Sequence, residues 1–177
     1  MKDATARSIL DAAGAIVAER GVWGLSLGEL AKELGVSKGT LSYYFPTKQA
    51  LVSAVGADCI KTTGDRLFSW VDSANSGSDP EEALGLLSDA LLSEPGLRLF
   101  VALYTGAEPE SELEAETDRA MSEWNVMLEV GAMRLKPAAA SRMKRVLPAV
   151  LPFLCGLAAL NADPDYAKEA FAAFVLG

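Results

Sequence analysis

The chain has 177 residues, of which 50% are apolar and 23% are charged, so it is long enough to bury a sizeable core and too apolar to be a disordered tail. Its 24 acidic and 16 basic residues give a net charge of -8, which excludes a polycation that coats nucleic acid without specificity. The sequence contains no histidine, so imidazole-dependent nucleophiles and histidine-ligated metal sites are excluded. We therefore expect no catalytic centre, no metal and no cofactor.

The two cysteines, Cys59 and Cys155, lie far apart without a CxxC spacing. They predict neither a zinc ribbon nor a disulfide framework, and they fit the reduced thiols of a cytoplasmic protein. The first eight residues form a polar start, and the longest apolar stretch, residues 146–160, contains two prolines. That stretch is shorter than the roughly 20 residues needed to cross a bilayer. We therefore expect a cytoplasmic protein without a membrane segment.

Helical periodicity runs through almost every segment, and no segment shows the sustained alternation of a strand. The predicted fold class is all-α with about nine helices. Turn-forming residues predict the helix ends and starts, which lie at Gly21, Gly35, Pro46, the run 75–80, the run 94–96, Pro109, Pro137 and Pro164.

The first predicted helix carries an apolar stripe from Ile9 to Val17 and ends at Gly21. The second begins at Ser26, which forms a capping-box pattern with Glu29 three residues later. Gly35 ends this second helix.

Ser37 is placed to cap a third, very short helix, whose expected buried contacts are Leu41 and Phe45. Two helices joined by a short glycine turn, with the small residue Ala31 one turn before it, are typical of a helix-turn-helix. The sequence therefore predicts a helix-turn-helix in which this short helix is the second of the pair.

The other residues of the third helix have the chemistry of a DNA-contacting surface. An ammonium group, hydroxyls and a glycine suit base edges and phosphates in a groove. Free backbone amides at the helix starts near Ser26 and near Thr47 and Lys48 suit phosphate oxygens. Packing against the first helix is an equal alternative for either tyrosine. The exposed set is Lys38, Gly39, Thr40, Ser42, Tyr43 and Tyr44.

The run from Gly21 to Leu51, and above all Gly35–Lys48, resembles the DNA-binding domain of the tetracycline-repressor (TetR) family of transcriptional regulators. The resemblance covers about residues 5–55. It implies an all-helical homodimer that binds a palindromic operator through its amino-terminal domain and a small effector through its carboxy-terminal domain. Ser42 stands where family members often carry an aromatic residue, and we expect Trp23 to pack rather than to contact DNA. The positions implied to contact DNA are Ser26, Ser37, Lys38, Thr40, Tyr43, Tyr44 and Lys48.

Charge divides the chain unevenly. Residues 1–60 carry six basic and six acidic side chains, whereas residues 61–177 carry ten and eighteen. We expect a helix-turn-helix domain over residues 1–46 and an effector-binding and dimerisation domain over residues 47–177. A helix that begins after Pro46 and continues toward Trp70 would join them without a flexible linker.

Aromatic and methionine side chains in the second domain could line an adaptable, largely apolar effector pocket. The alternative for each of them is ordinary core packing. The first candidates for pocket residues are Trp70, Phe100, Tyr104, Trp124 and Met127.

Acidic residues alternate along the stretch from Glu108 to Asp118. A period of two does not select one face of a helix, so we expect a solvated helix start where the acids favour the positive end of the dipole. The alternative is the mouth of a site for cationic ligands.

The last two helices are the expected dimer interface. Pro148 and Pro152 are expected to break or kink the first of them, unless Pro148 starts a new helix. The alternative is that the two apolar faces are buried within one chain. The predicted interface residues are Leu151, Leu154, Ala158, Phe171, Phe174 and Val175.

We interpret the sequence as a ligand-responsive transcriptional regulator that binds double-stranded operator DNA as a homodimer and represses until a small molecule releases it. An alternative is a small-molecule-binding or protein-interaction module that has lost specific DNA binding, which the sparse basic residues would permit. An enzyme would need an acid–base pair of carboxylates or lysine, and no spacing singles one out.

Overall fold

The computed structural model describes residues 2–74, 80–92 and 96–176, and within these ranges it contains nine α-helices, one 3-10 helix and no strand. The predicted all-α fold class is confirmed. The predicted turns at 75–79 and at Glu94 and Pro95 lie outside the described residues. The helices are α1 (Lys2–Arg20), η1 (Val22–Gly24), α2 (Leu27–Glu33), α3 (Lys38–Tyr44), α4 (Lys48–Ser73), α5 (Pro80–Leu92), α6 (Gly96–Gly106), α7 (Glu112–Arg134), α8 (Pro137–Ala159) and α9 (Pro164–Leu176).

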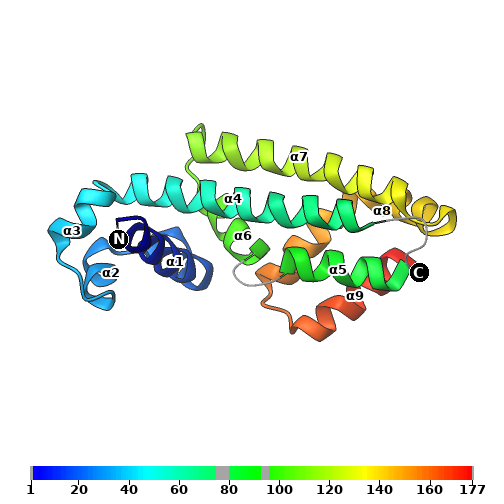
Figure 1. Ribbon diagram of the computed structural model, residues 1–177, viewed down its shortest axis with the longest axis horizontal. Coiled ribbons are helices and arrows are strands. Elements are labelled where there is room, and N and C mark those ends of the chain that lie inside the picture. The colour runs from blue at the N-terminus through cyan, green and yellow to red at the C-terminus, as the bar shows by residue number, and fades with distance from the viewer. Residues whose placement is uncertain (1, 75–79, 93–95, 177) are drawn as a thin grey trace.

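The molecule is elongated, with α1, α2 and α3 at one end and α5, α9 and the carboxy terminus at the other (Figure 1). Helices α4 and α7 lie side by side along its length. The third helix is therefore the part of the chain that projects farthest from the carboxy-terminal helices.

The turn between α2 and α3 depends on Gly35, which has a φ of 65°. Glycine adopts this left-handed conformation without a steric penalty. The Val36 amide then donates to the Ala31 carbonyl at 3.0 Å and the Gly35 amide to the Lys32 carbonyl at 3.2 Å, which ends the helix as a Schellman motif. Helix η1 was not predicted; it follows Gly21, whose carbonyl accepts from the Gly24 amide at 3.1 Å.

Helix α4 joins the two ends of the molecule, as predicted. Its 26 residues span about 39 Å at the usual rise per residue. Leu51 and Val55 are buried in its amino-terminal half, and Leu67 and Trp70 in its carboxy-terminal half. All four belong to one apolar core cluster that also contains residues of α1, α2 and α3. No flexible linker therefore separates the helix-turn-helix from the rest.

The predicted dimer residues lie in the core of a single chain, in agreement with the alternative interpretation. Leu151, Leu154 and Phe171 are fully buried without any second copy, so their assignment to a surface interface is wrong. Their side chains cover the inner face of the last two helices, whereas Phe174 stays partly exposed and stacks on Phe153 with 4.4 Å between ring centroids. The same correction holds for the nearly buried pair Ala158 and Val175.

Of the break or kink expected at the two internal prolines, the break is wrong. Helix α8 continues through Pro148 and Pro152 from Pro137 to Ala159. Both prolines are exposed, so their rings lie on the outer side of the helix. Each lacks only its own amide hydrogen bond, and the rest of the helix is held by the buried inner face.

Gly131 lets α7 approach the indole of Trp70 on α4. A β-carbon at position 131 would collide with Cζ3 of that ring. The indole is 3% exposed, and its Nε1 donates to the Ala83 carbonyl at 2.8 Å, so the ring is held in place beside Gly131.

We predict that Gly131→Ala destabilises the protein by about 1–3 kcal/mol, because the added methyl overpacks the contact between α4 and α7. Urea unfolding monitored by circular dichroism measures the loss. The matched control is Gly85→Ala in α5, where a β-carbon meets nothing within 4 Å. The control should gain about 0.5–1 kcal/mol, as expected for alanine in an open helix position. Equal stability of the two variants would contradict this packing.

Burial protects both free cysteines. Burial raises the pKa of the Cys59 thiol to about 12 and that of Cys155 to about 11. Because these folded-state values exceed those of the unfolded chain, the thiols contribute stability fully below the unfolded pKa and lose it as the pH rises toward 11 to 12.

We predict that iodoacetamide labels neither thiol of the native protein appreciably at pH 8, since the thiolate is the reactive form. Intact-mass spectrometry with and without denaturant measures the rates, and Cys59→Ser separates the two sites. Labelling of native Cys59 at the unfolded rate would show that its surroundings open to solvent.

Candidate functional site

Helix α3 is held by its cap and by one buried side chain. The Ser37 hydroxyl accepts from the Thr40 amide at 3.0 Å and lies 2.8 Å from the Thr40 hydroxyl. Leu41 is 1% exposed and anchors the helix in the core, while Phe45 is partly buried beside it. These contacts fix the outer face of a helix that is too short to be stable by itself.

Five of the nine residues predicted to contact DNA lie on that exposed face. Ser37, Lys38, Gly39, Thr40 and Ser42 are all exposed. The arrangement presents hydroxyls and one ammonium group together, as a helix entering a DNA groove requires.

The two tyrosines behave differently. Tyr43 is 68% exposed, whereas Tyr44 is partly buried and packs against the core. Their rings meet edge to face with 5.3 Å between centroids. The packing alternative therefore describes Tyr44 in part, whereas most of the Tyr43 side chain is exposed to solvent.

Two capped helix starts flank this face. The Ser26 hydroxyl accepts from the Glu29 amide at 3.4 Å, and the Thr47 hydroxyl accepts from the Ala50 amide at 3.0 Å. The side chain of Lys38 extends toward the start of α2, because its Cε would lie 3.7 Å from a β-carbon on Gly28. Helix starts with nearby lysines are suited to phosphate oxygens.

The expectation that the Trp23 side chain is taken up by packing is wrong. Its side chain is 79% exposed, and Nζ of Lys48 lies 5.8 Å from its ring centroid. The tryptophan and the lysine thus form one exposed cation–π pair beside α3. The sequence placed Trp23 after Gly21 in a segment of no clear period, so only the fold of η1 reveals its exposure.

The five predicted pocket residues do not enclose a cavity together. Phe100 and Trp124 are buried with 4.6 Å between their ring centroids, and Tyr104 stacks on Phe100 at 6.2 Å while remaining half exposed. Trp70 borders an open groove, and Met127 is partly buried. Core packing describes the buried three, and ligand contact by any of the five stays a prediction.

Two cavities that are partly open to solvent lie elsewhere in the described part of the chain. One, of about 310 Å³, lies between α1, α4 and α6. The other, of about 240 Å³, lies among α5, α6, α8 and α9. Their lining residues are scattered over the sequence, so no local pattern could have identified them.

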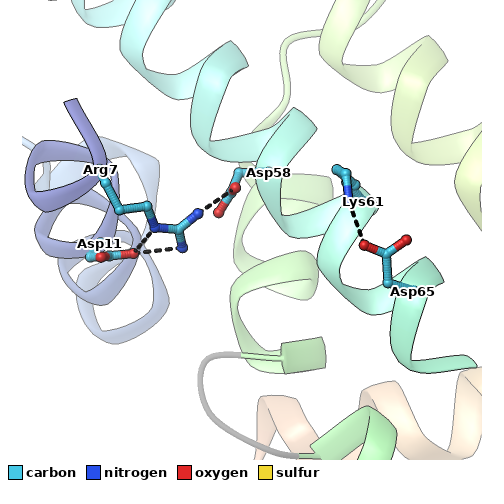
Figure 2. Close-up of polar contacts among 5 residues, drawn as sticks. All are labelled: Arg7, Asp11, Asp58, Lys61 and Asp65. Atoms are coloured by element: carbon cyan, nitrogen blue, oxygen red, sulfur yellow. Dashed lines mark hydrogen bonds and ion pairs between the residues drawn. The ribbon is translucent and has the colours of Figure 1, made fainter. Parts of the chain in front are cut away.

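Arg7 connects α1 to α4 at the edge of the first cavity (Figure 2). Its Nε donates to Asp11 at 2.8 Å and its Nη1 to Asp58 at 2.7 Å. The hydrogen bond to Asp11, followed by the interactions with Asp58, raises the pKa of the Arg7 guanidinium. A second pair, Lys61 with Asp65, lies along α4 and does not cross to another helix (Figure 2).

The acidic stretch forms a helix start. The Ser111 hydroxyl accepts from the Glu114 amide at 3.2 Å, and the Glu114 carboxylate accepts from the Glu110 amide at 2.6 Å. Among the described residues, no group of acids is arranged to hold a metal ion. The solvated helix start therefore accounts for these residues.

No helix in the described ranges is both long and apolar enough to traverse a lipid bilayer.

Residues 9–55 match the family of bacterial regulatory proteins, tetR family. Two curated proteins are similar to the chain. The uncharacterized HTH-type transcriptional regulator YvdT of Bacillus subtilis (strain 168) is 27% identical over 60% of this chain and 54% of its own length. The HTH-type transcriptional regulator BetI of Serratia proteamaculans (strain 568) is 25% identical over 87% of this chain and 75% of its own length. The chain thus spans about half the length of YvdT.

The fold beyond residue 55 is also found in known structures. The crystal structure of a regulator from Saccharomonospora viridis in complex with choline superposes with a TM-score of 0.74. It covers 98% of this chain and 96% of that protein at 18% identity, which establishes the shared fold. The helix-turn-helix of residues 9–55 thus matches the tetR family of bacterial regulatory proteins, and the chain has the same helical fold as the Saccharomonospora viridis regulator.

Proposed function

We propose that this regulator is a ligand-responsive repressor that acts in the cytoplasm as a homodimer on a palindromic operator. The observation that carries the proposal is the exposed polar face of α3, anchored by Leu41 and capped by Ser37. A small-molecule effector would release the DNA.

In the proposed complex, α3 of each copy enters the major groove, where Thr40 and Ser42 reach base edges. Ser26 and Lys38 then lie beside the phosphates on one side, and Lys48 on the other. The exposed ring of Trp23 holds the Lys48 ammonium near the same surface.

Dimerisation would use the outer face of α8 rather than its buried face. Ala149, Pro152, Gly156 and Ala159 are exposed at helical spacing, and Leu160 next to them is 81% exposed. Small apolar side chains let two copies approach closely. A two-fold pair then sets the distance between the two α3 helices, which a palindromic site requires.

Effector binding would favour a conformer in which the two α3 helices have the wrong separation. Choline is bound by the Saccharomonospora viridis protein, which supports a small-molecule site in a fold of this kind. Because α4 is continuous, displacement of its carboxy-terminal half changes the direction of its amino-terminal end. The effector shifts the equilibrium only by its differential affinity for the two conformers.

We predict that Thr40→Ala changes sequence preference, with about 1–3 kcal/mol lost at one base pair, whereas Lys48→Ala weakens binding to all duplexes alike. The Lys48 variant should also reduce the slope of log affinity against log salt by about one. Fluorescence anisotropy with the duplex upstream of the protein's own gene, and with a shuffled duplex, measures both effects. Lys144→Ala, an exposed lysine on α8, is the matched control.

If the wild-type dimer shows no sequence-selective binding at low salt, the repressor proposal is wrong. Retained binding of small molecules by the same preparation would then favour the alternative of a module that has lost specific DNA binding.

We predict that Gly156→Glu converts the dimer into monomers and abolishes tight operator binding. A β-carbon at position 156 meets nothing within 4 Å, so the new side chain leaves the chain's own core undisturbed and places a charge in the interface. The matched control is Gly85→Glu, on an equally open position of α5. Sedimentation velocity measures the mass, and a Gly156→Glu protein that stays dimeric would exclude this face.

A further inference from the structure

The smaller of the two cavities has a mostly apolar wall and lies near the end of the molecule opposite α3 (Figure 1). Its volume is about 240 Å³, and it lies among α5, α6, α8 and α9. Leu157 and Ala158 of α8 and Ala167 of α9 form buried parts of this wall. Pockets for drug-sized ligands usually exceed about 300 Å³, so the occupant must be smaller.

Ser88 of α5 places an unsatisfied hydroxyl at this cavity. The residue is 1% exposed, and its Oγ is the only buried side-chain oxygen or nitrogen in the described ranges without a hydrogen-bond partner. Other helical serines of this chain donate to the carbonyl four residues earlier, as Ser69 and Ser122 do at 3.0 Å. A buried hydroxyl without a partner is costly, so a molecule in the cavity that pairs with Ser88 gains affinity from that bond.

The charged residues that line this cavity already have partners. Nζ of Lys168 lies 2.7 Å from the Asp89 carboxylate, and both side chains are about half exposed. Arg98, the other cation of the lining, has an interaction of its own. An ionised ligand would therefore leave water without a free opposite charge to meet it, which is costly in an apolar cavity. The lining thus favours an uncharged molecule.

The remaining polar groups decide whether that molecule should donate or accept a hydrogen bond. At the end of α8, the Leu157 carbonyl accepts from the Ala162 amide at 3.0 Å. The next carbonyl, of Ala158, accepts from the Asn161 amide at 3.1 Å, and the Asn161 side chain is exposed to solvent. An alcohol and the Ser88 hydroxyl can pair one of their two hydrogens with each other, and the second hydrogen then stays unpaired. A carbonyl oxygen accepts the Ser88 hydrogen and brings none of its own.

We propose that the cavity binds a small ketone, an uncharged molecule with one carbonyl oxygen and a compact hydrocarbon body. The carbonyl oxygen accepts a hydrogen bond from the Ser88 hydroxyl, and the hydrocarbon body lies against Leu157 and Ala162. The buried donor supplies orientation, and the apolar wall supplies most of the contact area. The inference deepens the proposed function, on which it rests for the role of the ketone as the effector.

Helix α5 connects the site to α4. The Ala83 carbonyl, in the same helix as Ser88, accepts from Nε1 of Trp70 on α4 at 2.8 Å. Leu84 and Leu87 of α5 are buried in the core cluster that also contains the buried residues of α4. A molecule that displaces α5 therefore acts on the carboxy-terminal half of α4, whose amino-terminal end follows α3.

The test is calorimetric titration of the full-length protein with acetophenone, 1-phenylethanol, ethylbenzene, benzoate and 1-phenylethylammonium, which share one aromatic ring and differ in their polar group. Acetophenone should bind and raise the melting temperature. The alcohol should bind more weakly by about fivefold or more, because one hydroxyl hydrogen stays unpaired in the cavity. The two ions should bind more weakly than acetophenone by about tenfold or more, because they lose their hydration without gaining a free opposite charge.

Ser88→Ala isolates the hydrogen bond. It should weaken acetophenone binding about two- to tenfold, as expected for one neutral hydrogen bond, and leave ethylbenzene binding unchanged, since ethylbenzene has no acceptor. The melting temperature of the free variant should stay equal or rise, because the unsatisfied hydroxyl is gone. The matched control is Ser122→Ala, whose hydroxyl is bonded within α7, and it should change the binding of neither ligand.

Ala162→Phe fills the cavity and should abolish the binding of both acetophenone and ethylbenzene, which decides the case if Ser88→Ala does not fold. Ala115→Phe, at an exposed position of α7 outside the cavity, is the control for this variant and should bind both ligands as the wild type does.

Any of four results would overturn the proposal. Acetophenone does not bind at millimolar concentration, the alcohol or either ion binds as tightly as acetophenone, Ser88→Ala does not weaken acetophenone binding selectively, or Ala162→Phe still binds the ketone. Operator binding is measured separately on the same preparation, with and without acetophenone. Failure of ketone binding with normal operator binding overturns only the site, and ketone binding without selective operator binding overturns only the repressor. Ketone binding that leaves operator affinity unchanged overturns the effector role.

Discussion

Everything else in this molecule depends on the continuity of α4. Its amino-terminal cap is Thr47, directly after α3, and its buried residues pack on α1 near one end and on α5 and α7 near the other. The amino-terminal helices therefore cannot turn independently of the helix on which they are mounted. A helix of this length moves as a rod, so a small tilt at Trp70 becomes a larger displacement near Leu51.

Apolar packing, rather than ion pairing, holds α1 against α4. Arg7 connects the two helices through Asp58, but both side chains are partly exposed, and such a pair contributes about 0–1 kcal/mol. Full burial of one side chain such as Ile9 or Leu51 contributes about 1.5–3 kcal/mol. The pair can select one arrangement among several of similar packing, and its loss would not separate the helices.

Local signals predicted the helices and the exposed polar face of α3, because capping and turn chemistry act over a few residues. Ser37, Gly35 and Thr47 are in the expected conformations for that reason. Periodicity could not decide which side of α8 faces the core, since Leu154 and Gly156 lie on two faces that are both apolar or small. Sequence patterns could not identify the pocket residues either, because aromatic residues such as Trp124 fill a core as readily as they line a cavity. Charged residues from separate helices come together only when the chain folds.

Because of the charge distribution, the DNA affinity of the proposed dimer depends on how its two copies are arranged. Residues 1–60 carry no net charge, so each amino-terminal end of the proposed dimer has little nonspecific attraction for phosphates. Affinity then depends on both α3 helices docking at once, with capped helix starts and a few lysines supplying the phosphate contacts. Because one short helix binds weakly alone, a modest change in separation removes most of the affinity without changing any DNA-contacting side chain. In the proposed repressor, an effector that displaces α4 far from the DNA would therefore be sufficient for control.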